Sequence, residues 1–119
     1  DERYERFHRE KGPTIYASTK AALERMSAGV AAELRADGIA VNTLAPVEAV
    51  ASEGAMDMGA IDATAGYEPL EQMAEAALLL CSEPPAQCSA LCVLSGPLLA
   101  RHGRVVRGLD GKTMAAMAG

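Results

Sequence analysis

The chain has 119 residues, half of them hydrophobic but only four aromatic (three Tyr, one Phe), and a formal net charge of −5. This length fits one domain at most. The acidic balance argues against nucleic acid or an anionic membrane surface as a partner, since both need a basic patch. No apolar run approaches the ~20 residues of a membrane span, and the charged N-terminus is unlike a secretory signal.

Residues 1–12 alternate acidic and basic side chains. Glu5 and Arg9 stand four positions apart, which is the spacing of an ion pair on one helix face. The segment therefore predicts a short solvated helical stretch, ended by Gly12-Pro13.

A long alanine-rich helix is predicted over 15–36, because alanine has the highest helix propensity and Asp37-Gly38 is a typical stop. Tyr16 and Lys20 lie one turn apart on one face of it. A cation beside a phenol favours the phenolate, so the pair suits proton transfer, although an ordinary amphipathic helix also carries such pairs. The expected apolar positions of this helix are Ala22, Leu23, Met26, Val30 and Leu34.

The next predicted element is a strand over 39–45, apolar on both faces as in a buried parallel sheet. It contains the run Val41-Asn42-Thr43-Leu44-Ala45 and ends at Pro46. The run follows the Tyr16/Lys20 pair at a distance set by one helix and one turn. Together the two motifs are far more specific than either one.

The two motifs, at this separation, resemble the C-terminal half of a short-chain dehydrogenase/reductase over roughly residues 14–100. The resemblance implies an α/β fold: a partial Rossmann-like, doubly wound parallel sheet made of a C-terminal β-α-β portion and the Tyr-x-x-x-Lys helix. It also implies NAD or NADP as cofactor and hydride transfer between nicotinamide and a small alcohol or carbonyl compound. Tyr16 would then transfer the proton, and Lys20 would support the phenolate and bind the nicotinamide ribose.

Further cofactor contacts follow from the same resemblance. The family segment after the strand reads P-G-x-[VI]-x-T, whereas here Val47 replaces the glycine and Ser52 falls one position late. The implied contacts are Lys20, Pro46, Val47, Val50 and Ser52. The family's glycine-rich cofactor turn does not occur in the sequence, and residues 1–12 contain no Ser or Thr for its catalytic serine. We therefore expect a truncated chain, inactive alone, whose partner is a missing N-terminal half or a second copy.

The rest of the chain predicts a loop with one short helix over 47–67, a helix over 69–82 and a strand over 91–95, parallel to the first. The expected apolar stripe of the helix is Leu70, Met73, Ala74, Ala77, Leu78 and Cys81. From Gly96 on, the chain reads as an irregular tail, disordered over 113–119. The expected organisation is a charged segment or substrate loop (1–12), a dehydrogenase-like portion (13–100) and a tail (101–119).

The three cysteines, Cys81, Cys88 and Cys92, lack C-x-x-C spacing, so no metal site is expected. Cys81 and Cys92 fit small core hydrophobes, and reduced thiols suit the cytoplasm. A second class of function stays open. The chain has apolar strands with little to cover them, so it is alternatively a non-catalytic module that docks through its uncovered sheet and alanine-rich helix.

Overall fold

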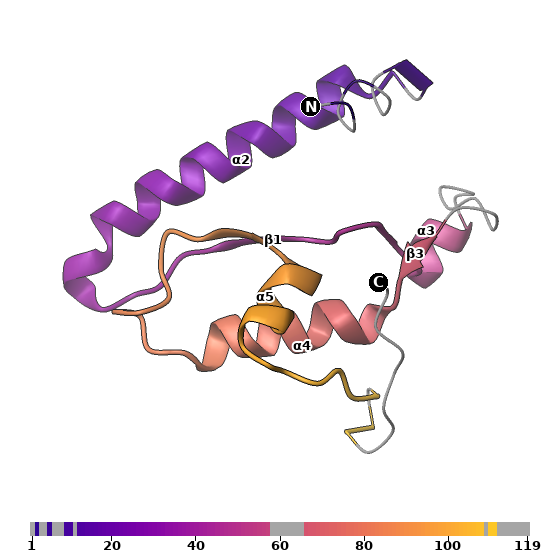
Figure 1. Ribbon diagram of the computed structural model, residues 1–119. Helices are drawn as coiled ribbons and strands as arrows, with labels where there is room; N and C mark the ends of the chain where they lie inside the picture. The colour runs from indigo at the N-terminus through magenta and orange to yellow at the C-terminus, as the bar shows by residue number, and fades with distance from the viewer. Residues whose placement is uncertain are drawn as a thin grey trace.

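The computed structural model describes residues 2, 5, 9, 10, 12–57, 66–108, 110 and 111. Its central feature is a pair of parallel strands, β1 (Thr43–Ala45) and β4 (Cys92–Leu94), with Thr43 opposite Cys92. A second parallel pair joins β2 (Ala49–Val50) to β3 (Tyr67–Glu68). Helices flank these strands (Figure 1). The predicted α/β class and the parallel pairing of the two main strands are confirmed.

The long helix α2 (Thr14–Glu33) is followed by a 3-10 turn, η1 (Arg35–Asp37). Gly38 then adopts the left-handed conformation with φ +69°, and its N–H binds the Arg35 carbonyl at 3.2 Å. Glycine takes this conformation without the steric penalty of a Cβ. The predicted helix over 15–36 and its stop at Asp37-Gly38 are confirmed, with the last turn tightened.

Helix α2 covers only part of the sheet and leaves most of its own surface exposed, as expected of an uncovered alanine-rich helix, although Val30 and Leu34 are half-buried. Ala31 is its one buried residue, and Leu23 and Met26 are exposed. In Figure 1, α2 lies on one side of β1 and α4 on the other. A two-stranded sheet is too narrow to cover a helix of 20 residues, so part of the apolar side of α2 stays exposed.

Both main strands are shorter than predicted, because side chains replace ladder bonds at their start. The Val41 N–H donates to Ser89 Oγ at 3.2 Å. The Asn42 amide donates to the Cys88 carbonyl and accepts the Leu91 N–H, both at 3.0 Å. These bonds tie residues 41–42 to the turn before β4 without regular strand geometry.

Helix α4 (Leu70–Ser82) confirms the element predicted over 69–82, but not its apolar stripe. Leu70 and Leu78 are exposed, as are Ala74, Ala77 and Cys81. The buried face is instead Gln72, Glu75, Ala76, Leu79 and Leu80. The reason is tertiary: the chain after β4 packs on this second face and forms the core with it.

That packing overturns the prediction of an irregular chain from Gly96. Residues Ser95–Arg101 form a helix, α5, whose Leu98 and Leu99 are buried. Val106, further along, is also fully buried in the same cluster. Leu98, Leu99 and Val106 supply the apolar surface against which α4 packs. Residues 113–119 lie outside the described residues.

Two smaller features complete the fold. Helix α3 (Glu53–Asp57) is the short helix expected between 47 and 67. The predicted pair near the N-terminus is present, with Arg9 Nη2 at 3.6 Å from Glu5 Oε2. Within the described part of the chain, no helix is both long and apolar enough to cross a membrane.

Candidate functional site

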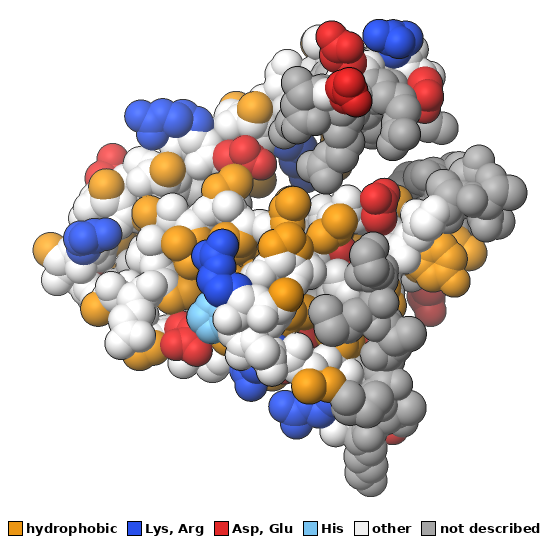
Figure 2. Space-filling model, in the orientation of Figure 1, with side chains coloured by type: hydrophobic (Ala, Val, Ile, Leu, Met, Phe, Trp, Pro, Cys, Tyr) orange, Lys and Arg blue, Asp and Glu red, His pale blue; other side chains and the backbone are white. Residues whose placement is uncertain are grey.

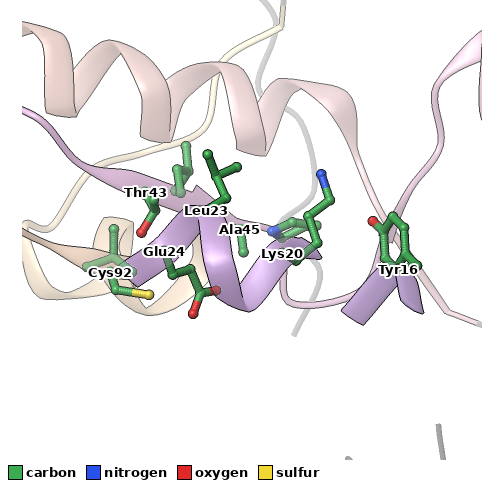
Figure 3. Close-up of a pocket in the computed structure, with 10 residues that line it drawn as sticks. Tyr16, Lys20, Leu23, Glu24, Thr43, Ala45 and Cys92 are labelled. Carbon is green, nitrogen blue, oxygen red and sulfur yellow. The ribbon is translucent and has the colours of Figure 1, made fainter. Parts of the chain in front are cut away.

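A cavity of about 220 Å³ lies between α2 and the two main strands. Its lining combines one face of α2 with the whole of β1, the residue after it and the first two residues of β4: Tyr16, Lys20, Leu23, Glu24, Thr43, Leu44, Ala45, Pro46, Cys92 and Val93 (Figure 3). Ligands of open parallel sheets bind at the carboxyl ends of strands. One end of this cavity, at Ala45 and Pro46, reaches that position.

Tyr16 and Lys20 lie on the α2 wall of the cavity, which the Glu24 carboxylate also lines. Their four-residue spacing sets them on successive turns, and both reach the same cavity (Figure 3). The Lys20 ammonium lies 5.4 Å from the centre of the Tyr16 ring, within the range of a cation–π contact. The Tyr16 side chain remains accessible, with 59% of the residue exposed. A substrate oxygen could thus approach the phenol from solvent.

Short backbone bonds hold this turn of the helix. The Ala17 N–H donates to the Pro13 carbonyl at 2.8 Å, which closes the first helical turn. The hydroxyls of Ser18 and Thr19 donate back to the carbonyls of Thr14 and Tyr16, at 2.8 and 2.7 Å. These bonds occupy the Tyr16 carbonyl and fix the helical turn that carries its side chain.

The predicted cofactor contacts that follow β1 lie in three different parts of the structure. Pro46 lines the cavity with Tyr16 and Lys20. Val47 adjoins it, but its side chain lies against Gly96, where an added Cβ would be 3.3 Å from Val47 Cγ2. Val50 pairs with Glu68 between β2 and β3, and Ser52 lines a different surface hollow beside α3. The structure thus brings together Tyr16, Lys20 and Pro46, but not Val50 or Ser52.

Three residues with a place in or beside the site were not predicted. Glu24 lines the cavity, and its spacing from Lys20 and Tyr16 on the same helix face could have identified it. Cys92 also lines the cavity and is exposed, which corrects its expected core role. Glu68 is fully buried beside Val47, and no local pattern marks a buried glutamate.

The volume of the cavity limits the size of the ligand that it could hold. Small-molecule pockets usually enclose roughly 300–1,000 Å³, so a volume near 220 Å³ suits a single ring. A phenol, an ammonium and the Glu24 carboxylate stand at one wall, and the residues of β1 and β4, including Thr43 and Cys92, form the other. Such a site could hold a small ring with polar substituents. Among the described residues, no group of three or more His, Cys, Asp or Glu side chains could hold a metal ion.

Comparison with known proteins agrees with this geometry. No protein-family model matches the chain, and neither does any curated protein. A short-chain dehydrogenase from Mycobacterium thermoresistibile matches with a TM-score of 0.65 and 32% identity over 76% of this chain. A protein from Xanthomonas campestris designated a dehydrogenase matches over the same share with a TM-score of 0.57 and 27% identity. The chain spans about a third of each (32%). The resemblance to short-chain dehydrogenases is thereby confirmed.

Proposed function

We propose that this chain, whose α/β fold is that of the short-chain dehydrogenases over the region it matches, carries the proton-transfer residues and the nicotinamide side of an NAD(P)-dependent oxidoreductase. The observation that carries the proposal is the shared cavity: Tyr16 and Lys20 line it together with Pro46 at the end of β1. Two sequence motifs thus meet at one small site, which runs along β1 to the carboxyl end of that parallel strand. The proposed substrate is a small alcohol or carbonyl compound.

In the proposed reaction the cofactor transfers the hydride, and side chains of this protein transfer the proton. When bound, the nicotinamide of NAD or NADP would supply or accept the hydride. Tyr16 donates its phenolic proton to the oxygen of a carbonyl substrate, and takes a proton back from an alcohol in the reverse direction. The Lys20 ammonium, on the next turn, stabilises the phenolate left on Tyr16 by its opposite charge. Pro46 and the apolar residues of β1 form the wall against which a flat ring can lie.

The test is a chimera in which this chain replaces the matching third of the Mycobacterium thermoresistibile dehydrogenase. It is assayed for oxidation of NADH and NADPH with a panel of small aldehydes and ketones. We expect turnover by the chimera and none by the 119-residue chain alone, which has no glycine-rich pyrophosphate turn in its sequence. Tyr16→Phe should lower kcat by roughly 10²- to 10⁴-fold, the usual contribution of a general acid.

The matched control is Tyr67→Phe, which removes the hydroxyl of another exposed tyrosine outside the cavity. It should leave turnover within a few-fold of the parent chimera. Activity of Tyr16→Phe equal to that of the control would exclude Tyr16 as the proton donor. Turnover by the isolated chain would refute the expectation that it needs a complementary part.

A binding function without catalysis is the second candidate, and the exposure of α2 favours it. Ile15 is 80% exposed and Met26 60% exposed, so the helix offers apolar surface to a second copy or to a complementary part. A titration of the 119-residue chain with NADH separates the two candidates. Nicotinamide fluorescence changes if the cavity binds the ring, and it stays unchanged if the chain is only a docking module. The free thiols of Cys81, Cys88 and Cys92 suit a reducing compartment, and we propose the cytoplasm.

A further inference from the structure

Glu68 holds the backbone that leads away from the cavity. It is fully buried, at the end of β3. Its Oε2 accepts the N–H of Val47 at 2.8 Å, and its main-chain carbonyl accepts the N–H of Ala51 at 3.2 Å. One residue therefore binds both ends of the segment 47–51, through its side chain at one end and its backbone at the other.

The surroundings of Glu68 restrict this segment further. Val47 Cγ2 lies where a Cβ on Gly96 would approach to 3.3 Å, and the same Cβ would lie 3.4 Å from Gln72 Nε2. Gln72 is also fully buried, and its Nε2 donates to Ser95 Oγ at 3.3 Å. Val47 is thus held on two sides: its amide by Glu68, and its side chain by the first turn of α5.

Stability alone explains this arrangement poorly. Burying a carboxylate is unfavourable unless its oxygens are hydrogen-bonded or paired with a cation. Within the described residues, Glu68 Oε1 has no hydrogen-bond partner, and neither has Gln72 Oε1. An apolar residue at position 68 would avoid this penalty. An apolar residue could not accept the Val47 N–H. We therefore explain the buried carboxylate by its role in orienting the backbone at Val47.

We propose that Glu68 is a positioning residue for the nicotinamide side of the site. It acts through the backbone of Val47, which directly follows the cavity residue Pro46, and does not itself line the cavity. By holding 47–51 at both ends, it sets where the chain after β1 stands relative to Tyr16 and Lys20. This inference rests on the proposed function, because it assumes that the nicotinamide contacts this part of the backbone.

The first measurement follows amide hydrogen exchange by NMR in the 119-residue chain without any ligand. Glu68→Ala should speed exchange of the Val47 amide by about tenfold or more, since a bond to a charged acceptor is lost. The Thr43 amide, bound to the Leu91 carbonyl at 2.8 Å, is the internal reference and should not change. Glu68→Gln keeps an acceptor oxygen and should stay near the parent value. Glu48→Ala removes an exposed carboxylate close to Val47 and serves as the matched control.

The second measurement adds reduced nicotinamide mononucleotide, which carries the nicotinamide and its ribose phosphate but no adenine half. The parent chain should show shifted amide signals over 45–52. Glu68→Ala should weaken binding by about tenfold or more, Glu68→Gln should restore most of it, and Glu48→Ala should bind like the parent. If Glu68→Ala gives no cooperative melt, Glu68→Asp replaces it, since a side chain shorter by one methylene keeps the charge but withdraws the acceptor.

The outcomes separate the two proposals. No shifted signals in the parent chain, together with no turnover by the chimera, would refute the proposed function and, with it, the role of Glu68. If the chimera turns over, a KM for NADH that Glu68→Ala leaves unchanged in it would overturn only the positioning role. Equal binding by the parent and Glu68→Ala would overturn only the positioning role. Unchanged Val47 exchange in Glu68→Ala would also overturn it, because the bond would then not hold the segment.

Discussion

The three thiols of this chain have different surroundings, and their reactivity should differ accordingly. Cys88 is buried, with its sulfur 3.9 Å from the Asn42 amide nitrogen. Cys81 and Cys92 are exposed, which corrects the prediction that both are core residues. Burial raises the pKa of the Cys88 thiol, and the nearby charges of Glu83 and then Cys81 act in the same direction.

We expect an alkylating reagent to modify Cys81 and Cys92 first and Cys88 last, because the accessible thiolate is the reactive species. Mass spectrometry of the digested protein after timed labelling measures the order. The raised pKa of Cys88 also predicts how the stability of the fold changes with pH. The contribution of Cys88 to stability is fully present below the pKa of an unfolded thiol and is lost as the pH rises through the raised pKa of the folded state. Labelling of Cys88 as fast as Cys81 would contradict its burial.

At the scale of elements, the core depends on α5 and the chain after it packing on α4. The contributing side chains of α4 are Leu79 and Leu80, and those of the later chain are Leu98, Leu99 and Val106. The same face buries Glu75, whose Oε1 lies 3.8 Å from Arg104 Nε. A helix face with two polar residues becomes the core face because a partner element, folded against it, supplies both apolar contact and a cation.

Leu99→Ala should lower the free energy of unfolding by about 2–5 kcal/mol, the usual effect of truncating a fully buried leucine. The matched control is Leu78→Ala on the exposed side of α4, which should change it by no more than about 0.5 kcal/mol. Urea unfolding followed by circular dichroism compares the two. Similar midpoints for both variants would mean that α5 does not pack on α4 in solution.

For the whole molecule, the dominant feature is a long helix with little to cover it. Hydrophobic side chains gather along the hollow between α2 and the rest of the molecule (Figure 2). Ile15, Leu23 and Met26 of α2 are all exposed. Exposed apolar surface of this kind usually marks an interface, and its burial is worth about 25 cal/mol per Å² before the entropic costs of association.

We expect the chain to self-associate in solution and Met26→Glu to weaken the association, because a charge would be buried in the apolar contact. Sedimentation equilibrium over a range of concentrations measures it. Val105→Glu is the control, since Val105 is a similarly exposed apolar residue far from α2 in sequence. A compact monomer with a cooperative thermal transition would show that the chain closes its own core and that α2 needs no partner.

Local patterns were sufficient for the helix that carries Tyr16 and Lys20, for the stop at Gly38 and for strands near β1 and β4. Helical spacing, a left-handed glycine and two-sided apolar runs are properties of neighbouring residues, so the sequence alone could predict them. The parallel pairing of β1 with β4 followed instead from the order strand, helix, strand. The residues that line the cavity were predicted in part: helical spacing places Tyr16 and Lys20 on one face, and the family resemblance adds Pro46.

Which face of α4 is buried, the existence of α5 and the placement of Glu68 could not be read locally. Each depends on a contact with a distant segment: Glu68 binds Val47 across 21 positions, and Gln72 binds Ser95 across 23. A hydrophobic period shows that a helix has an apolar side, but not which partner will cover it. Packing against α5 overrode the stripe of Leu70, Leu78 and Cys81, because burying Leu79, Leu80 and Leu99 together removes more apolar surface from water than either helix can remove alone.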